Sequence, residues 1–317
     1  MKTVGKAVGV SIAIPSDAYY SFFNSPYVGH QQSSSLDIYP AHGEWGGSGF
    51  SPVSGRVTIV RRFKMGRKKD FVTSDYDYAI GIQPSNDEEH LVRLLHCHPV
   101  VKRGDSIEAG EEVGSLIRSR YFNFWTAPHY HIDVMTSRDF NRSSQSHTIT
   151  SAINLSPGIK IHGQYPLNEV DWTIRSVTAD CAIASSSRLK FGELDGIYGH
   201  IGEIGSGVAG LLDGGINHYP LCGFFGANGN IGMVHIGNEI IGSLDGNPRG
   251  APFFHQNRLH SIFLDELKIR GISTYIASKH QLVSGLLPLK LIPLEYKGFE
   301  NLLKEGDTCR LILLPHG

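Results

Sequence analysis

The chain lacks the features of a cysteine-rich or membrane-spanning protein. Only four cysteines occur in 317 residues, at Cys97, Cys181, Cys222 and Cys309, and no two of them form a CxxC pair. This argues against a cysteine zinc knuckle, and the wide spacing is more typical of a reduced compartment than of a disulfide scaffold. No apolar run reaches the roughly 18 residues that a membrane-spanning helix needs.

The chain also lacks an excess of charge of either sign. Lysine and arginine total 29, aspartate and glutamate total 30, and the formal net charge is −1. Hydrophobic residues make up 40% and charged residues 19%, which is typical of a soluble globular protein. This balance implies neither a nucleic acid nor an anionic membrane as a partner. The one strongly basic run, residues 61–69, is interpreted as a solvated hairpin tip.

A clear signal peptide is missing from the N-terminus. Lys2 and Lys6 precede the apolar run 7–15, but Gly9 interrupts that run and no small-x-small cleavage site follows. We interpret the run as a β-strand, and on this ground a cytoplasmic location is favoured.

What the chain has in excess is histidine and glycine, with 16 and 37 residues respectively. The glycines concentrate between Gly192 and Gly250, and short apolar segments separated by Gly, Pro, Asn and Asp predict a mainly β protein. Residues 53–60 and 78–82 are predicted strands. Helical spacing of apolar residues occurs only late, over 257–270, where Leu259, Ile262, Phe263, Leu267 and Ile269 fall near one face, and a second short helix is predicted over 296–305.

The length suggests about two domains. Residues 141–151 (NRSSQSHTITS) are polar and serine-rich, which is typical of a linker. We therefore predict one domain over residues 1–145 and a second, glycine-rich and mostly β, over residues 151–317, with one or two helices and a role that the sequence does not define.

The pattern richest in chemistry lies at residues 128–134, Pro-His-Tyr-His-Ile-Asp-Val. Side chains on a strand alternate between its faces, so His129 and His131 share a face if the segment is extended. Two imidazoles aimed into one space can both bind a metal, or one can bind the metal while the other moves protons.

Further candidate ligands lie upstream. His30 and Asp37 precede a strand-like segment, and His96 and His98 lie in the segment Leu-His-Cys-His-Pro. A catalytic zinc ion typically takes three nitrogen or oxygen ligands and keeps a fourth position for water. Two histidines and one aspartate as ligands, with one or two further histidines, form a sufficient set for metal-assisted hydrolysis.

These segments, taken in order, resemble the LytM and lysostaphin-type zinc metallopeptidases, which have the duplicated hybrid motif fold. The resemblance covers roughly residues 28–135. Its blocks are Leu36-Asp37-Ile38, the stretch 51–57 (SPVSGRV), Leu95-His96, the stretch 101–114 (VKRGDSIEAGEEVG) and the closing stretch 128–134. The last two blocks are the specific ones. The fold implied for the first domain is a LytM-like β-sandwich or barrel.

The resemblance implies a role for each matching residue. Asp37 and His131 become zinc ligands, His129 matches the family's catalytic histidine, and His96 matches the second histidine that lines the site. His30 would be the remaining ligand. However, His30 and Asp37 are separated by six further residues rather than three, and Ser33 occupies the position at the usual spacing. His98 remains an alternative to His96.

The family precedent implies a zinc-dependent endopeptidase acting on peptidoglycan-type or glycine-containing peptides, and it favours a location outside the cytoplasm. A second hypothesis is a degenerate, metal-free LytM-like module that binds a partner protein. The unusual spacing between His30 and Asp37 favours this second hypothesis.

Overall fold

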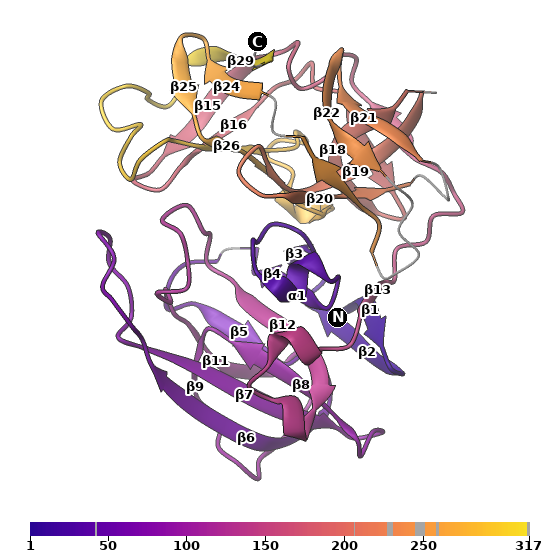
Figure 1. Ribbon diagram of the computed structural model, residues 1–317, viewed down its shortest axis with the longest axis vertical. Coiled ribbons are helices and arrows are strands. Elements are labelled where there is room, and N and C mark those ends of the chain that lie inside the picture. Colours follow the sequence, from indigo (N-terminus) through magenta and orange to yellow (C-terminus); the bar gives the residue numbers. More distant parts are fainter. Residues whose placement is uncertain (42, 206, 227–230, 245–250, 258–259, 316–317) are drawn as a thin grey trace. The chain divides into compact units, whose positions relative to one another are not determined.

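The computed structural model describes residues 1–317 except 42, 206, 227–230, 245–250, 258–259 and 316–317. The chain divides into two compact units. The first comprises Met1–Tyr20 and Tyr27–Ile153, and the second comprises Ser21–Pro26 and Asn154–Gly317. Figure 1 draws most of the first unit in indigo to magenta and most of the second in rose to yellow.

The largest part of the first unit is a seven-stranded sheet with the order β10-β6-β7-β8-β12-β4-β3. Its strands are β3 (Tyr19–Ser21), β4 (Ser35–Tyr39), β6 (Gly55–Lys64), β7 (Tyr76–Pro84), β8 (His90–Leu95), β10 (Ser106–Ile107) and β12 (Tyr130–Thr136). The strands from β10 to β4 pair antiparallel with their neighbours.

Among the described residues of this unit, two smaller sheets and three short helical turns accompany the large sheet. One sheet has the order β13-β1-β2, and the other has the order β5-β11-β9. Their strands are β1 (Lys2–Ala7), β2 (Val10–Ile14), β5 (Ser48–Phe50), β9 (Cys97–Pro99), β11 (Glu112–Leu116) and β13 (Thr150–Ser151). The helical turns are α1 (Val28–Gln31), η1 (Ser137–Asp139) and η2 (Ser143–Gln145). Within the run 7–15, which the sequence predicts to be a β-strand, Val10–Ile14 form β2, and β2 pairs with β1 across a turn at Val8 and Gly9.

Apolar and polar side chains alternate along β4 and β12, so the two kinds of side chain lie on opposite faces of these strands. Leu36, Ile38, Ile132 and Val134 are all fully buried. Because successive side chains on a strand point to opposite faces, these apolar residues hold the strands in place while the polar residues between them point the other way.

In the part of the second unit that the structure describes, a sheet of 16 strands is present. They are β14 (Lys160–His162), β15 (Asp171–Val177), β16 (Ala182–Ser185), β17 (Phe191–Leu194), β18 (Ile197–Ile204), β19 (Val208–Ile216), β20 (Leu221–Phe225), β21 (Gly232–Ile236), β22 (Glu239–Leu244), β23 (Phe253–Gln256), β24 (His260–Leu264), β25 (Leu267–Ile269), β26 (Gly271–Thr274), β27 (Ala277–Ser278), β28 (Leu289–Ile292) and β29 (Thr308–Pro315). A closed barrel of six strands runs β18-β19-β20-β23-β22-β21 and back to β18.

The barrel explains the local abundance of glycine. A Cβ atom on Gly210 would lie 2.2 Å from the ring of Phe224, which is fully buried. Glycine is needed there because the ring of Phe224, from the neighbouring strand β20, lies against Gly210 of β19 and leaves no room for a side chain. The prediction of a mainly β fold is confirmed.

The predictions of two helices in the second unit are wrong. Within 257–270 the described residues form the hairpin of β24 and β25, with Asp265 at a φ of 50° in the turn. Leu259 lies outside the described residues. Ile262, Leu264 and Ile269 are buried at strand spacing, so the apolar residues that fit a helix also fit two short strands.

Residues 296–305 form consecutive turns rather than a helix. Lys297 and Asn301 have φ values of 67° and 64°, which interrupt helical geometry. Among the described residues of this unit, the helical element is the short 3-10 turn η3 (Lys279–Gln281). Across the part of the chain that the structure describes, no helix has the length and apolar character to cross a membrane.

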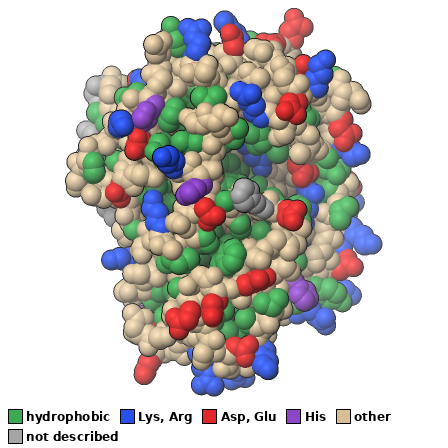
Figure 2. All heavy atoms as spheres, turned by 180° about the vertical axis from the view of Figure 1, so that it is seen from behind, with side chains coloured by type: hydrophobic (Ala, Val, Ile, Leu, Met, Phe, Trp, Pro, Cys, Tyr) green, Lys and Arg blue, Asp and Glu red, His purple; other side chains and the backbone are tan. Residues whose placement is uncertain are grey.

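On the face that Figure 2 shows, basic and acidic side chains are interspersed, with hydrophobic side chains between them. Neither sign of charge forms a continuous field on this face.

Candidate metal centre

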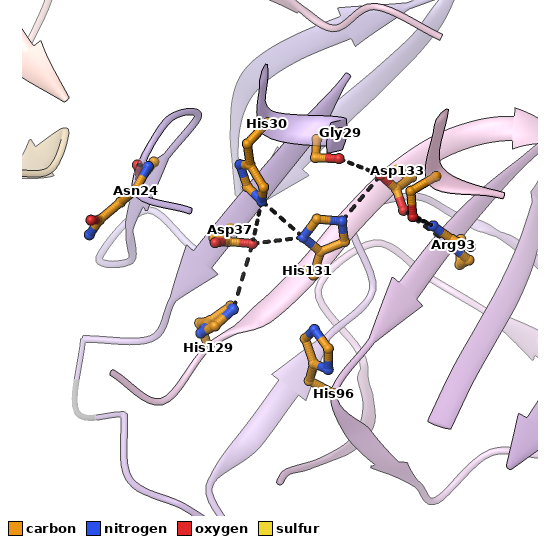
Figure 3. A network of polar contacts seen from close by, with 12 residues as sticks. Asn24, Gly29, His30, Asp37, Arg93, His96, His129, His131 and Asp133 are labelled. Atoms are coloured by element: carbon orange, nitrogen blue, oxygen red, sulfur yellow. Dashed lines mark hydrogen bonds and ion pairs between the residues drawn. The ribbon is translucent and has the colours of Figure 1, made fainter. Parts of the chain in front are cut away.

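The pairing of β4 with β12 places Asp37 directly opposite His131. Both side chains lie on the face opposite the apolar residues of these strands, and both are buried. Strand register therefore joins two residues that lie 94 positions apart in the sequence. Figure 3 shows their side chains pointing toward each other, with His30 and His129 beside them.

His30 reaches the same point from α1, which contacts β4. The chain leaves α1 through Ser33, whose φ of 54° lies in the left-handed region, before β4 begins at Ser35. This turn accommodates the three extra residues between His30 and Asp37. His30 is 1% exposed, and its Nε2 atom lies 3.3 Å from Oδ1 of Asp37.

Three donor atoms form a small triangle. Nδ1 of His131 lies 2.8 Å from Oδ1 of Asp37 and 3.2 Å from Nε2 of His30, and the third side measures 3.3 Å. Tetrahedral zinc with bonds of about 2.0 Å places adjacent ligand atoms about 3.3 Å apart. The donor set and its spacing therefore fit a zinc ion, and these three residues form the group that could hold a metal among the described residues.

Electrostatics in this triangle favour a charged aspartate. Burial opposes ionisation of Asp37, but the neighbouring His30 and His129 outweigh it and hold the pKa of Asp37 well below its usual range. Burial likewise opposes protonation of His131, but Asp133 and Asp37 outweigh it and raise the pKa of His131 to about 10. The pocket thus attracts positive charge, here a proton on an imidazole.

Asp133 supports His131 from behind. Its Oδ1 atom lies 3.2 Å from Nε2 of His131, and it accepts a hydrogen bond from Oγ of Ser35. Oδ2 of Asp133 accepts hydrogen bonds from Nε and Nη2 of Arg93. A carboxylate that holds the second ring nitrogen fixes the orientation of a ligating histidine and raises its basicity.

His129 lies at the edge of the triangle. Its Nδ1 atom donates to the carbonyl of Ala127, 2.9 Å away, so its Nε2 atom is left facing Asp37 at 3.6 Å. Burial lowers the pKa of His129 to about 4, which keeps the imidazole neutral near pH 7.

His96 approaches from the turn between β8 and β9, at a backbone φ of 70°. Its Nδ1 atom lies 2.7 Å from Oδ2 of Asp77, which also accepts a hydrogen bond from Ser119. Burial raises the pKa of Asp77, but the interaction with His96 outweighs it and lowers that pKa overall. The ring centroids of His96 and His129 lie 5.7 Å apart, so both imidazoles border the same space.

The structure brings together all five residues predicted for the site: His30, Asp37, His96, His129 and His131. The alternative, His98, is exposed on β9 and packs edge-on against Tyr78 instead. Three further residues that contact the site histidines or their partners were not predicted from the sequence: Asp133, Arg93 and Asp77. The spacing of Asp133, two residues after His131 on the same strand, is a signal that could have found it.

Comparison with known proteins gives a family match over part of the chain. A family described as the N-terminal domain of a domain of unknown function, DUF8155, matches residues 11–151. No curated protein matches the chain.

Three solved structures are similar at low identity. A mutant of the catalytic domain of the prophage-encoded M23 protein EnpA from Enterococcus faecalis is 18% identical, with 36% of this chain and 72% of that chain covered and a TM-score of 0.25. The solution structure of lysostaphin is 16% identical over 60% and 86% of the chains, with a TM-score of 0.25. The antimicrobial peptidase lysostaphin from Staphylococcus simulans is 14% identical over 62% and 89%, with a TM-score of 0.28. Such low values do not assign this chain to a family.

Proposed function

We propose that this chain is a zinc-dependent peptidase that hydrolyses peptidoglycan-type or glycine-containing peptides. The observation that carries the proposal is the triangle of His30, Asp37 and His131, whose donor atoms lie 2.8–3.3 Å apart beside two further histidines. The motifs that resemble LytM and lysostaphin-type enzymes support the substrate class and an endopeptidase reaction.

The proposed division of roles follows from the contacts. His30, Asp37 and His131 would hold zinc, which when bound acts as a Lewis acid and lowers the pKa of water to about 7. Nε2 of His129 is the proton acceptor, because Nδ1 of the same ring is committed to the carbonyl of Ala127.

His96 lines the other side of the space. Asp77 accepts the hydrogen bond from its Nδ1 atom, so its opposite nitrogen is held in one orientation. There it can stabilise the negative charge that develops on the carbonyl oxygen of the substrate.

The competing hypothesis is the metal-free binding module. The test is cleavage of a pentaglycine-containing peptide and of a peptidoglycan-type stem peptide by the full chain without a histidine tag, followed by mass spectrometry. We expect cleavage that a chelator abolishes and that zinc restores. If neither peptide is cleaved by protein loaded with one zinc ion per chain, the peptidase proposal is wrong, and if the protein takes up no zinc the binding module is favoured.

A further inference from the structure

A cavity of about 500 Å³ adjoins the candidate metal centre within the first unit. Its floor is the polar face of the large sheet, with Leu95 and His131 from β8 and β12, and His96 forms part of its wall. Tyr27 and Val28 line it from the beginning of α1, and Phe63 lines it from β6. The cavity therefore begins at the proposed reacting groups and offers apolar walls to a ligand.

Residues 137–145 contribute Asn141 and Ser143 to the wall of the cavity. Phe140 in this segment is 3% exposed and belongs to a cluster with Ala79, Leu91 and Met135 on the sheet. Gly81 makes room for it, because a Cβ atom at that position would lie 2.8 Å from the ring of Phe140. The ring of Phe140 thus packs on the sheet and anchors the segment that carries it.

Arginine side chains fasten residues 140–143 to the sheet. Arg93 donates to the carbonyl of Phe140 and to Oγ of Ser143, and Arg61 donates to Oδ1 of Asn141. Both arginines come from strands of the sheet, so the segment is held at two points. Asn141 and Ser143 line the cavity together with these arginines.

A hydrogen bond from Tyr27 Oη to the carbonyl of Tyr121 joins two other walls. The two rings meet edge to face, with centroids 6.2 Å apart, and both residues line the cavity. The cavity is therefore bordered by two tyrosine rings as well as by the polar face of the sheet.

The charged group on the cavity wall that is available to a ligand is the guanidinium of Arg61. Arg93 is already paired with Asp133, and Asp77 is hydrogen-bonded to His96 and Ser119. Arg61 is exposed and has no ion pair within the described residues. Since Oδ1 of Asn141 accepts from Arg61, the amide N–H groups of Asn141 are additional donors. A guanidinium with amide donors is a good match for a carboxylate.

We propose that this cavity binds the free α-carboxylate end of a peptide, with an apolar terminal residue against Tyr27 and Phe63 and the carboxylate at Arg61. The inference rests on the proposed function and narrows its substrates to peptides whose free carboxyl end reaches this cavity.

The experiment measures binding without catalysis. The full chain, freed of metal with a chelator, is titrated calorimetrically with acetyl-Gly-Gly-Leu as the free acid and as the C-terminal amide. We expect the acid to bind about tenfold more tightly, since a charge-assisted contact is lost in the amide. Arg61→Gln should remove this preference.

Arg62→Gln is the matched control, because Arg62 makes the same change of charge but stacks on Tyr76, which does not line the cavity. It should keep the preference for the acid. Acetyl-Gly-Asp-Leu-amide, which carries its carboxylate on a side chain, separates recognition of a chain end from recognition of any carboxylate and should bind as weakly as the amide.

Equal affinity for acid and amide, equal losses in the two arginine variants, or no binding of either peptide at millimolar concentration would each overturn the proposal. The two hypotheses fail separately. Preference for the acid without any peptidase activity leaves the cavity assignment intact, whereas zinc-dependent cleavage at interior bonds with no preference for the acid leaves only the peptidase.

Discussion

Nε2 of His131 lies 3.2 Å from Oδ1 of Asp133, while Nδ1 of the same ring lies 2.8 Å from Asp37. Both ring nitrogens of His131 are thus held by carboxylates, one within the proposed metal triangle and one behind it. The orientation of the proposed ligand is therefore fixed by the fold before any metal binds.

Removing the charge behind His131 should weaken zinc binding. Asp133→Asn loses the carboxylate that orients the ring, so we expect zinc affinity to fall about 10- to 100-fold. Measured by competition with a chelating dye on protein shown to be folded, the loss should be absent in Asp87→Asn, a carboxylate that contacts His90 instead. Unchanged zinc affinity in folded Asp133→Asn would contradict a supporting role.

Asp133→Asn should also lower stability, because Arg93 is buried and loses a charged partner. Breaking one side of a buried pair costs about 3 kcal/mol. The thermal midpoint therefore serves as a separate readout from zinc affinity.

Asp77→Asn should affect the reaction and not the metal. Asp77 touches Nδ1 of His96 and none of the proposed ligands among the described contacts. We expect kcat on a cleaved peptide to fall about 100-fold with zinc still at one per chain. Asp75→Asn, a neighbouring carboxylate that pairs with Arg120, serves as the control. A normal kcat in Asp77→Asn would remove the proposed role of this pair.

The parts of the site that follow from strand periodicity were predictable. The alternation of His129, His131 and the apolar residues between and after them indicated one polar face, and the structure has that face. The position of His30 was not predictable from spacing, because it depends on the turn of α1 and on the left-handed backbone of Ser33. Asp77 and Arg93 come from strands whose pairing the sequence does not specify.

The misassigned helix has a physical explanation as well. Ile262 and Ile269 pair across a hairpin, and their spacing in sequence also matches two turns of a helix. Nothing in the sequence indicates that Ser21–Pro26 group with the second unit, where the backbone N–H of Phe22 donates to Asp213.

His200 should make the second unit sensitive to acid. It is 2% exposed on β18, and neither ring nitrogen has a hydrogen-bond partner among the described residues. Burial lowers its pKa to about 3. The unfolded chain takes up a proton near pH 6.5 and the folded chain does not, so the stability due to the neutral ring is complete above pH 6.5 and is lost as the pH falls toward 3.

Comparison with an apolar variant isolates this effect. Between pH 7 and pH 5, His200→Leu should gain about 2 kcal/mol of stability relative to the parent chain, measured by urea unfolding at each pH. His255→Leu, at an exposed position of β23, should show no such gain. Parallel pH profiles for His200→Leu and the parent chain would show that the buried ring does not titrate as described.

The central claim is that His30, Asp37 and His131 bind one zinc ion while His129 acts beside it. The most direct measurement is the zinc content of the untagged chain and of its His131→Ala and His129→Ala variants, determined by mass spectrometry after zinc loading and removal of free metal. The account predicts about one zinc per chain in the parent and in His129→Ala, and none in His131→Ala. Undiminished zinc in His131→Ala would contradict the account.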